Sequence, residues 1–143
     1  MHITTTSSTH YIGRLEYGDD LLAALTAFCV THNITAGTIA IIGAVQKVTF
    51  GYYSQTEKKY TGCHELNKKL EIASGMGNIS LKDGKPFCHI HGVFADYDGT
   101  TSGGHIMPGT IVFACEFSIQ SLPSEALVRT PEPTTGLPLW NKP

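Results

Sequence analysis

The chain has few charged residues and no strongly basic segment. Charged residues make up 15% of the 143 residues, and the formal net charge is −2. Nucleic-acid affinity depends mainly on lysines and arginines that neutralise phosphates. The densest basic clusters here are only two pairs, Lys58-Lys59 and Lys68-Lys69. This composition disfavours DNA binding by the chain alone.

Cysteine and long apolar segments are also scarce. The four cysteines form neither a C-x-x-C pair nor the dense set of a disulfide framework. The first residues, MHITTTSSTHYIG, lack the apolar stretch of a signal peptide. The longest apolar run, IAIIGAV, is far shorter than a membrane span. We therefore expect reduced thiols and a soluble, cytoplasmic protein that does not enter a membrane.

One segment has the pattern of an amphipathic helix. Four apolar side chains follow the spacing i, i+4, i+7, i+8 of one helix face: Leu21, Leu25, Phe28 and Cys29. Asp19 or Asp20 can cap the start of this helix, and Asn33 is a plausible stop signal. No other segment has as strong a helix pattern, so we expect one main helix over about residues 20–32.

Strand patterns occupy most of the chain after this helix. Residues 36–45 are apolar on both faces, as in a central strand. Gly75 and Gly77 interrupt a further strand pattern, which predicts a bulge or a close backbone approach. The Asp-Gly turn of KDGK leads into the strand PFCHIHGVFADY. The last strand pattern alternates, so that Phe113 is expected on the same side as Cys115.

The residues after Leu122 differ in composition from the rest of the chain. They hold five of the seven prolines and the only tryptophan, and proline excludes a regular helix or a central strand. Several of their apolar side chains are costly to expose: Leu127, Val128, Leu137, Leu139 and Trp140. We expect a single domain over 1–143, with a core of about 9–122. An extended arm, 123–143, would pack on its own domain or on a neighbour.

Three histidines carry the strongest functional signal. His89 and His91 are two residues apart, so on a strand they point to the same face and can converge on one ion. His105 follows a Gly-Gly pair, and it completes a three-nitrogen site if residues 87–95 and 103–107 lie side by side. Zinc accepts three protein nitrogens and an open position, usually filled by water. The alternative is that the histidines occupy a polar sheet face without a metal.

No fourth ligand or general base stands out. The candidates for a fourth ligand are Glu116, Asp96, Cys63 and His64, and those for a base are His64, Asp96 and Asp98. Cys63 and His64 are expected in a polar loop. Cys88 adjoins His89, yet on a strand it faces the opposite side, so we expect it in the core.

The sequence resembles the PPC family, the plants-and-prokaryotes-conserved domain, over about residues 9–141. Three segments carry the resemblance: RLEYGDDLLAALTAFCVTHNITAGTIAIIGAVQKVTFGYY, LEIASGMGNISLKDGKPFCHIHGVFADYDGTTSGGHIMPG and RTPEPTTGLPLW. Its most specific elements are Gly77-Asn78-Ile79, His89-x-His91, Gly103-Gly104-His105 and Thr135-Gly136-Leu137. The resemblance implies an α/β fold of the α+β type, a mostly antiparallel β-sheet with one main α-helix, assembled as a homotrimer.

The resemblance also implies a metal and a structural ion pair. Carried over, the ligands of zinc or another divalent transition metal would be His89, His91 and His105. Arg14 and Glu116 match family positions, and we expect them to form a buried pair that serves structure and not catalysis. Plant members carry the domain behind a basic AT-hook. This sequence has no Arg-Gly-Arg-Pro segment, so DNA is a partner by family analogy only.

Three functions remain open at this point. The preferred one is a stand-alone, metal-binding homotrimer with a regulatory or DNA-associated role, acting through a protein partner or a small-molecule ligand at the metal site. We assign it no catalytic residue. The second is a small, hydrolase-like enzyme with a metal-bound water on three histidines. The third is direct DNA binding, which would need a basic surface formed only on trimerisation.

Overall fold

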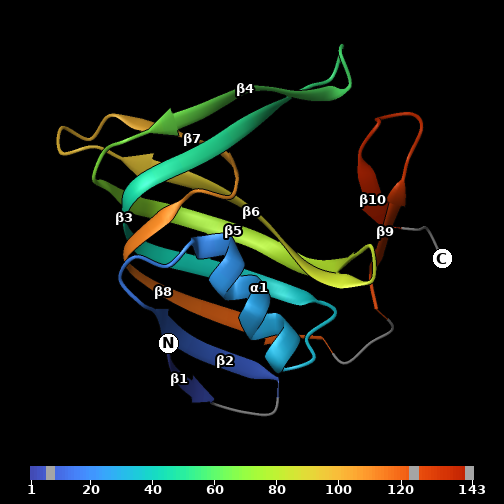
Figure 1. The fold of residues 1–143 in the computed structure, drawn as a ribbon, viewed down its shortest axis with the longest axis horizontal. Coiled ribbons are helices and arrows are strands. Elements are labelled where there is room, and N and C mark those ends of the chain that lie inside the picture. Colours follow the sequence, from blue (N-terminus) through green and yellow to red (C-terminus); the bar gives the residue numbers. More distant parts are fainter. Residues whose placement is uncertain (6–8, 123–125, 141–143) are drawn as a thin grey trace.

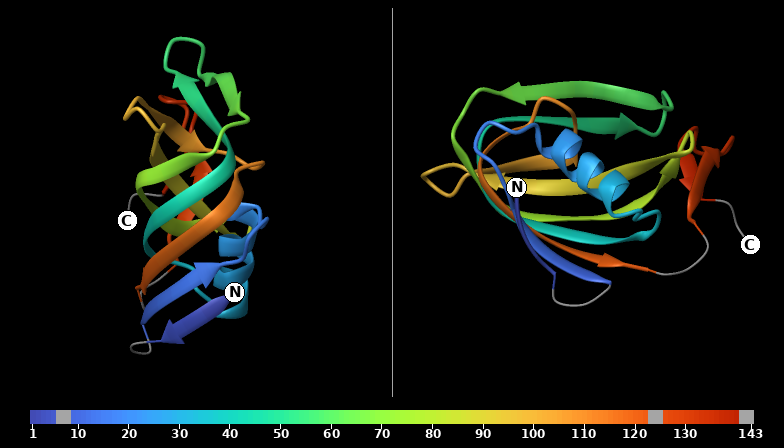
Figure 2. Two further views of the ribbon diagram at one scale, coloured as in Figure 1. Left: turned by 90° about the vertical axis from the view of Figure 1, so that its left-hand side faces the viewer. Right: turned by 60° about the horizontal axis from the view of Figure 1, so that its bottom comes forward.

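The computed structural model describes residues 1–5, 9–122 and 126–140. Within these residues, ten strands form one sheet and a single helix lies on one side of it (Figures 1 and 2). The strands are β1 (His2–Thr5), β2 (His10–Leu15), β3 (Gly37–Ser54), β4 (Lys59–Leu66), β5 (Leu70–Lys82), β6 (Lys85–Ala95), β7 (Thr101–Ile106), β8 (Ile111–Ser121), β9 (Val128–Pro131) and β10 (Pro138–Trp140).

The sheet is built around β3, which is 18 residues long. The strand order is β1-β2-β8-β3-β7-β6-β5-β9-β10, with β4 paired to β3 and an additional pairing of β3 with β5. All pairings are antiparallel except β5 with β9. This architecture confirms the expectation of a mostly antiparallel sheet with one helix. The short strand β1 has no counterpart in the sequence patterns.

The helix α1 (Leu21–Thr31) forms as its sequence predicts. The carboxylate of Asp20 accepts a hydrogen bond from the backbone N–H of Ala23 at 3.0 Å, which satisfies a free donor of the first turn. The chain leaves the helix through Asn33, whose φ of 53° lies in the left-handed region. The four residues of the predicted stripe are buried. No helix in the described ranges is long and apolar enough to cross a membrane.

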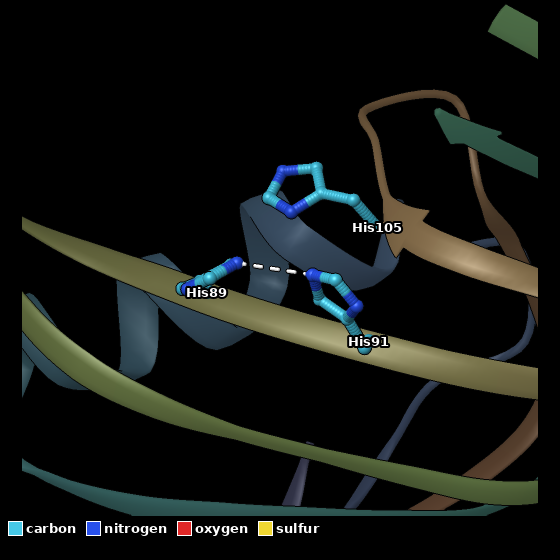
Figure 3. Close-up of side chains that lie close together, drawn as sticks. All are labelled: His89, His91 and His105. Carbon is cyan, nitrogen blue, oxygen red and sulfur yellow. Dashed lines mark hydrogen bonds between the residues drawn. The ribbon is translucent and has the colours of Figure 1, made fainter. Parts of the chain in front are cut away.

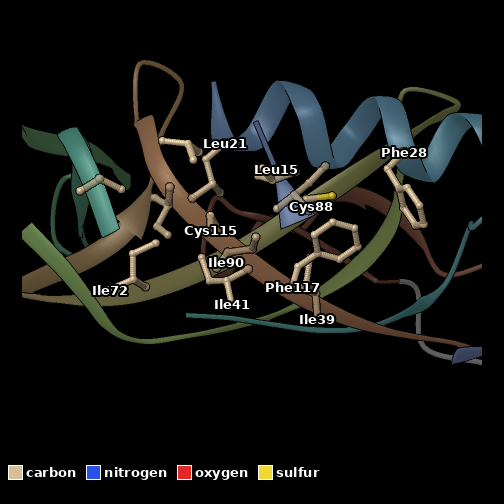
Figure 4. Packing of buried hydrophobic residues seen from close by; sticks show 14 of the residues in the cluster. Leu15, Leu21, Phe28, Ile39, Ile41, Ile72, Cys88, Ile90, Cys115 and Phe117 are labelled. Carbon is tan, nitrogen blue, oxygen red and sulfur yellow. The ribbon is translucent and has the colours of Figure 1, made fainter. Parts of the chain in front are cut away.

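The two faces of the sheet differ. The inner face, defined as the face that α1 covers, carries the buried apolar cluster, which includes Leu15, Ile41, Ile90 and Phe117 (Figure 4). The outer face carries the residues that alternate with these. Directly paired residues share a face, and one row of pairs runs Ile12–Ser118–Ala40–Met76–His91–His105. The predicted metal ligands therefore belong to the outer face.

Two expectations about β8 and β2 are wrong. Ala44 pairs with Ala114 and Val45 with Val112, so Phe113 is an extra residue in β8. This bulge turns Phe113 outward, 54% exposed, and buries Val112 in its place. Second, the side chain of Arg14 is 59% exposed and its Nη2 lies 3.6 Å from Glu16. Glu116 pairs with Arg14 in register and is also exposed, so no buried pair forms within the chain.

The C-terminal arm packs on its own chain. Strands β9 and β10 form a hairpin, and β9 extends the sheet beyond β5 through the parallel pair of Leu81 with Val128. The phenol of Tyr53 donates to the carbonyl oxygen of Thr135 at 2.7 Å, which ties the hairpin to β3. Residues 123–125 and 141–143 of the predicted arm lie outside the described residues. The arm thus extends the outer face at the end where β6 begins (Figure 1).

Candidate metal centre

The histidine strand β6 is fixed in register by a tight turn and by glycines. Asp83 and Gly84 both have positive φ, 52° and 73°, as the Asp-Gly turn between β5 and β6 requires. A Cβ on Gly77 would overlap the backbone carbonyl oxygen of His89, so only glycine fits there. Gly103 has the same relation to the carbonyl of Gly92. The predicted close backbone approach in β5 is confirmed.

The structure brings the three predicted ligands together. His89 and His91 lie on β6, and His105 lies on the neighbouring β7, directly opposite His91. One candidate ligand nitrogen from each ring can be chosen so that all three lie within 4.8 Å of one another. The Nε2 atoms of His89 and His91 are 3.2 Å apart (Figure 3). This spacing is what two adjacent strands impose when their side chains share a face.

One nitrogen of the cluster has no partner. The Nδ1 atom of His105 is buried and accepts or donates no hydrogen bond within the structure. A buried polar atom without a partner costs about 1–3 kcal/mol. Figure 3 shows the His105 ring placed above the two facing nitrogens of His89 and His91. An orphaned nitrogen beside two others is the donor set that an imidazole-preferring metal such as zinc requires, so the residues fit the metal.

The electrostatics of the cluster keep two of its rings neutral. Burial, followed by the positive potential of His105 and Arg129, lowers the pKa of His89 from 6.5 to about 4. Burial also lowers the pKa of His105 to about 4, with His91 and Arg129 as further causes. Metal ligation needs neutral imidazole. At neutral pH these two rings can therefore bind a metal without first losing a proton.

Arg129 on β9 is a neighbour of the cluster that sequence reasoning missed. Its Nε donates to Ser80 Oγ at 2.7 Å, and its Nη2 donates to Asn78 Oδ1 at 2.9 Å. The same Nη2 lies 3.4 Å from Nδ1 of His89. Arg129 is 40 residues away from His89 in the chain, and no spacing rule links a proline-rich arm to a strand. Only the pairing of β9 with β5 places it here.

The contact with Arg129 favours one tautomer of His89. Because a guanidinium can only donate, Nδ1 of His89 accepts, and the ring proton lies on Nε2. That Nε2 then donates to Nε2 of His91. A metal ligand at Nε2 needs a free lone pair there, so the proton must move to Nδ1. In the tautomer that offers Nε2 to a metal, Nδ1 of His89 would carry the proton and could not accept from Arg129.

A cavity of about 620 Å³ opens beside the cluster and includes all three histidines in its wall. Aromatic and aliphatic side chains make up most of the remaining wall, among them Tyr60, Phe87, Met107 and Leu139. The ring of Tyr60 lies 5.1 Å from that of His105. Lys82 and Arg129 are the two strong bases of the wall, and its described residues include no Asp or Glu.

The other residues proposed from the sequence lie elsewhere. Within the described part of the chain, the histidine cluster does not include Glu116, Asp96, Cys63 or His64. Asp96 pairs with Lys68 at 2.9 Å. Cys63 and His64 lie on β4 and not in a loop, because β3 extends far enough for Phe50 to pair with His64. Cys88 faces the core as expected, where its Sγ lies 3.9 Å from that of Cys29.

Solved structures similar to this chain come from archaea and bacteria. A metal-containing protein from Archaeoglobus fulgidus is 40% identical, with a TM-score of 0.90 and 99% of each chain covered. A PPC protein from Pyrococcus horikoshii is 32% identical, with a TM-score of 0.87 over 98% of this chain and 93% of that one. A chain from Bacteroides thetaiotaomicron, provisionally named a DNA-binding protein, is 26% identical, with a TM-score of 0.88 over 99% and 98%.

The curated relatives are longer proteins. Bifunctional protein GlmU from two Synechococcus strains is 31% identical over 125 residues and 30% identical over 136 residues. These matches cover 86% and 94% of this chain but only 18% and 20% of the relatives. The chain therefore spans about a fifth of the length of the curated relatives it matches. The model of the Plants and Prokaryotes Conserved domain matches residues 2–123, and the chain belongs to this family.

Proposed function

We propose that this protein is a PPC-domain module that binds one divalent transition metal, zinc in the first place, through His89, His91 and His105. The observation that carries the proposal is the buried Nδ1 of His105, which has no partner and lies beside two further imidazoles. Three imidazole ligands leave zinc an open position. A neighbour that is 40% identical and named a metal-containing protein supports the assignment.

The module acts as a homotrimer in this proposal. Four large apolar side chains of the outer face are 43–69% exposed: Ile12, Ile42, Met76 and Val93. Large apolar side chains exposed together on one face favour burial against another copy. Met76 pairs directly with His91, so a copy docked here would border the metal site.

DNA association rests on family analogy and on the names given to two similar structures. Three of the four lysines in the basic pairs that would carry it make contacts within the chain. Lys59 contacts Glu57 at 2.8 Å, Lys68 contacts Asp96 at 2.9 Å, and Lys58 donates to the carbonyl of Pro133. A gel shift that depends on salt and is lost in a Lys68→Gln/Lys69→Gln variant would support a role on DNA. A shift that the variant retains would argue against these lysines.

A hydrolytic function is the second candidate, favoured by the open cavity beside three ligands. A metal-bound water would need a base in reach. The described cavity wall offers no carboxylate, and burial raises the pKa of Tyr60, which keeps that phenol protonated. Turnover of p-nitrophenyl acetate by zinc-loaded protein, absent in the histidine variant below, would promote this candidate over the binding module.

The experiment that tests the proposed function is elemental analysis combined with light scattering. Wild type is compared with His89→Ala/His91→Ala and with His64→Ala, which removes a histidine outside the cluster. We expect about one zinc-like ion per chain in wild type and in His64→Ala, and none in the double variant. If all three proteins remain trimeric, assembly depends on the apolar face and not on the metal. Metal-free wild type after zinc loading would refute the proposal.

A further inference from the structure

The cavity beside the histidines combines positive charge with an absence of acidic groups in its described wall. Arg129 lies with its guanidinium carbon 5.3 Å from the centre of the Phe87 ring, and the ammonium of Lys82 lies 5.3 Å from the same ring. Imidazole ligands do not compensate the charge of a divalent ion. With the metal in place, the cavity would hold four positive charges and no fixed negative one.

The rest of the wall is apolar and shaped for a small molecule. A volume of about 620 Å³ lies within the range of pockets that hold small ligands. Tyr60, Met107, Leu137 and Leu139 offer aromatic and aliphatic surface. A simple inorganic anion would neutralise the positive charge but would leave this apolar surface exposed to water. An organic anion with an apolar body satisfies both.

We propose that the cavity binds a small organic anion, with its carboxylate or phosphate head at the metal's open position between Arg129 and Lys82. Its apolar or aromatic body packs against Tyr60, Leu137 and Leu139. This inference rests on the proposed metal site, because the metal supplies half of the positive charge that the head neutralises.

The hydrogen bonds of Arg129 prepare it for this role. Ser80 and Asn78 hold the guanidinium in place, so little side-chain entropy is lost when an anion binds. The N–H that faces Nδ1 of His89 would lose its acceptor if that ring carried its proton on Nδ1 and bound the metal through Nε2. An anionic head replaces the lost acceptor. Metal and anion should therefore bind cooperatively, each raising the affinity of the other by the same factor.

The β9–β10 hairpin determines which apolar group of the anion fits the cavity. Arg129, Leu137 and Leu139 all come from this hairpin, and the family model matches only residues 2–123. Hydrogen bonds brace the turn of the hairpin: Glu132 accepts from the backbone N–H groups of Thr134 and Thr135, each at 2.8 Å. The hairpin side of the wall is thus formed without a ligand.

The test uses protein loaded with Co²⁺, whose visible absorption reports the ligands of the metal. Four probes are titrated: benzoate, phenyl phosphate, acetate and the neutral benzamide. We expect benzoate or phenyl phosphate to shift the cobalt bands and to bind at least about tenfold more tightly than acetate, because a phenyl ring is buried. Benzamide should cause no comparable shift. Lys82→Gln should lower the affinity for the anions several-fold. The control is Lys85→Gln, which changes an exposed lysine outside the cavity wall and should leave the affinity unchanged.

Each outcome separates the two proposals. Failure of the protein to bind Co²⁺ refutes the proposed metal site. Normal cobalt bands that neither aromatic anion shifts would leave the metal site intact and overturn the anion pocket. Equal affinity for acetate and benzoate would overturn the role of the apolar wall. Equal weakening in Lys82→Gln and Lys85→Gln would overturn the local role of Lys82. A Leu139→Ser variant that loses affinity for benzoate but not for acetate would support the role of the hairpin.

Discussion

The side chains on the two faces of β6 differ in burial and in contacts. On the inner face, Cys88, Ile90 and Phe94 are buried against the helix and neighbouring strands. On the outer face, His89 and His91 meet a third histidine, and Val93 remains 43% exposed. The inner residues find all their partners within the chain. The outer face holds one buried nitrogen without a partner, Nδ1 of His105, and apolar side chains that the chain leaves exposed. The partners that we propose for them, a metal and a second copy, lie outside the chain.

The largest expected effect is on the inner face. Ile90 is fully buried, so Ile90→Ala should lower the free energy of unfolding by about 2–5 kcal/mol. The matched change on the outer face, Val93→Ala, should cost less than about 0.5 kcal/mol in the single chain. Urea denaturation at several protein concentrations measures both. A loss of unfolding free energy in Val93→Ala that increases with protein concentration would assign Val93 to the interface between copies. Equal losses in both variants at all concentrations would show that the two faces contribute equally to stability.

The next effect concerns metal and is confined to the outer face. His105→Leu keeps most of the ring's volume and removes its nitrogens, so metal affinity should fall by more than the roughly 10–100-fold loss typical of outer-sphere partners. The metal-free protein should not be destabilised, because the lost Nδ1 had no hydrogen bond. Competition with a chelator gives the affinity, and His64→Leu is the control. Retained affinity in His105→Leu would remove that residue from the ligand set.

Acid should lower the free energy of unfolding of the protein without metal, because two histidines of the outer face become protonated. Folded His89 and His105 have pKa values of about 4, below the ordinary 6.5. Between these values the unfolded chain binds protons that the folded chain does not, so the free energy of unfolding falls as pH decreases from about 6.5 to about 4. Urea midpoints across this range should fall more steeply in wild type than in His89→Gln/His105→Gln. Identical slopes would show that other groups cause the acid sensitivity.

The smallest expected effect lies in the hairpin turn. Hydrogen bonds from Thr134 and Thr135 lower the pKa of Glu132 to about 2, so this carboxylate remains charged under all ordinary conditions. Glu132→Ala should speed hydrogen exchange of these two backbone amides and leave the stability of the sheet nearly unchanged. Glu57→Ala, at another exposed turn, is the control. Unchanged exchange in Glu132→Ala would show that the contacts with Tyr53 and Lys58 suffice to hold the turn.

Sequence reasoning succeeded where the cause is local. The helix stripe ending at Cys29, the cap at Asp20 and the turn before β6 follow from periodicity, capping and backbone sterics, and the structure confirms them. The proximity of His105 to His91 also followed, because two short strands joined by a turn pair with each other. Metal ligation itself stays a prediction.

The remainder could not be read from the sequence because it depends on distant pairings. The exposed position of Phe113 arises from a bulge that β8 forms against β3. The place of Arg129 beside His89 arises from the pairing of β9 with β5. Resemblance to a family implied a buried Arg14–Glu116 pair, but burial depends on what covers the outer face. A single chain leaves that face open.

The position of β8 in the chain has a consequence for biosynthesis. β8 ends at Ser121, yet it pairs with both β2 and β3, and in the sheet order it alone joins β1 and β2 to the other strands. Strands β1 and β2 therefore cannot join the sheet until β8 has left the ribosome. Pairings of such long sequence separation are slow to form. Until then, the unpaired edges of β1 and β2 are exposed. Chaperone binding and aggregation are therefore favoured at this step.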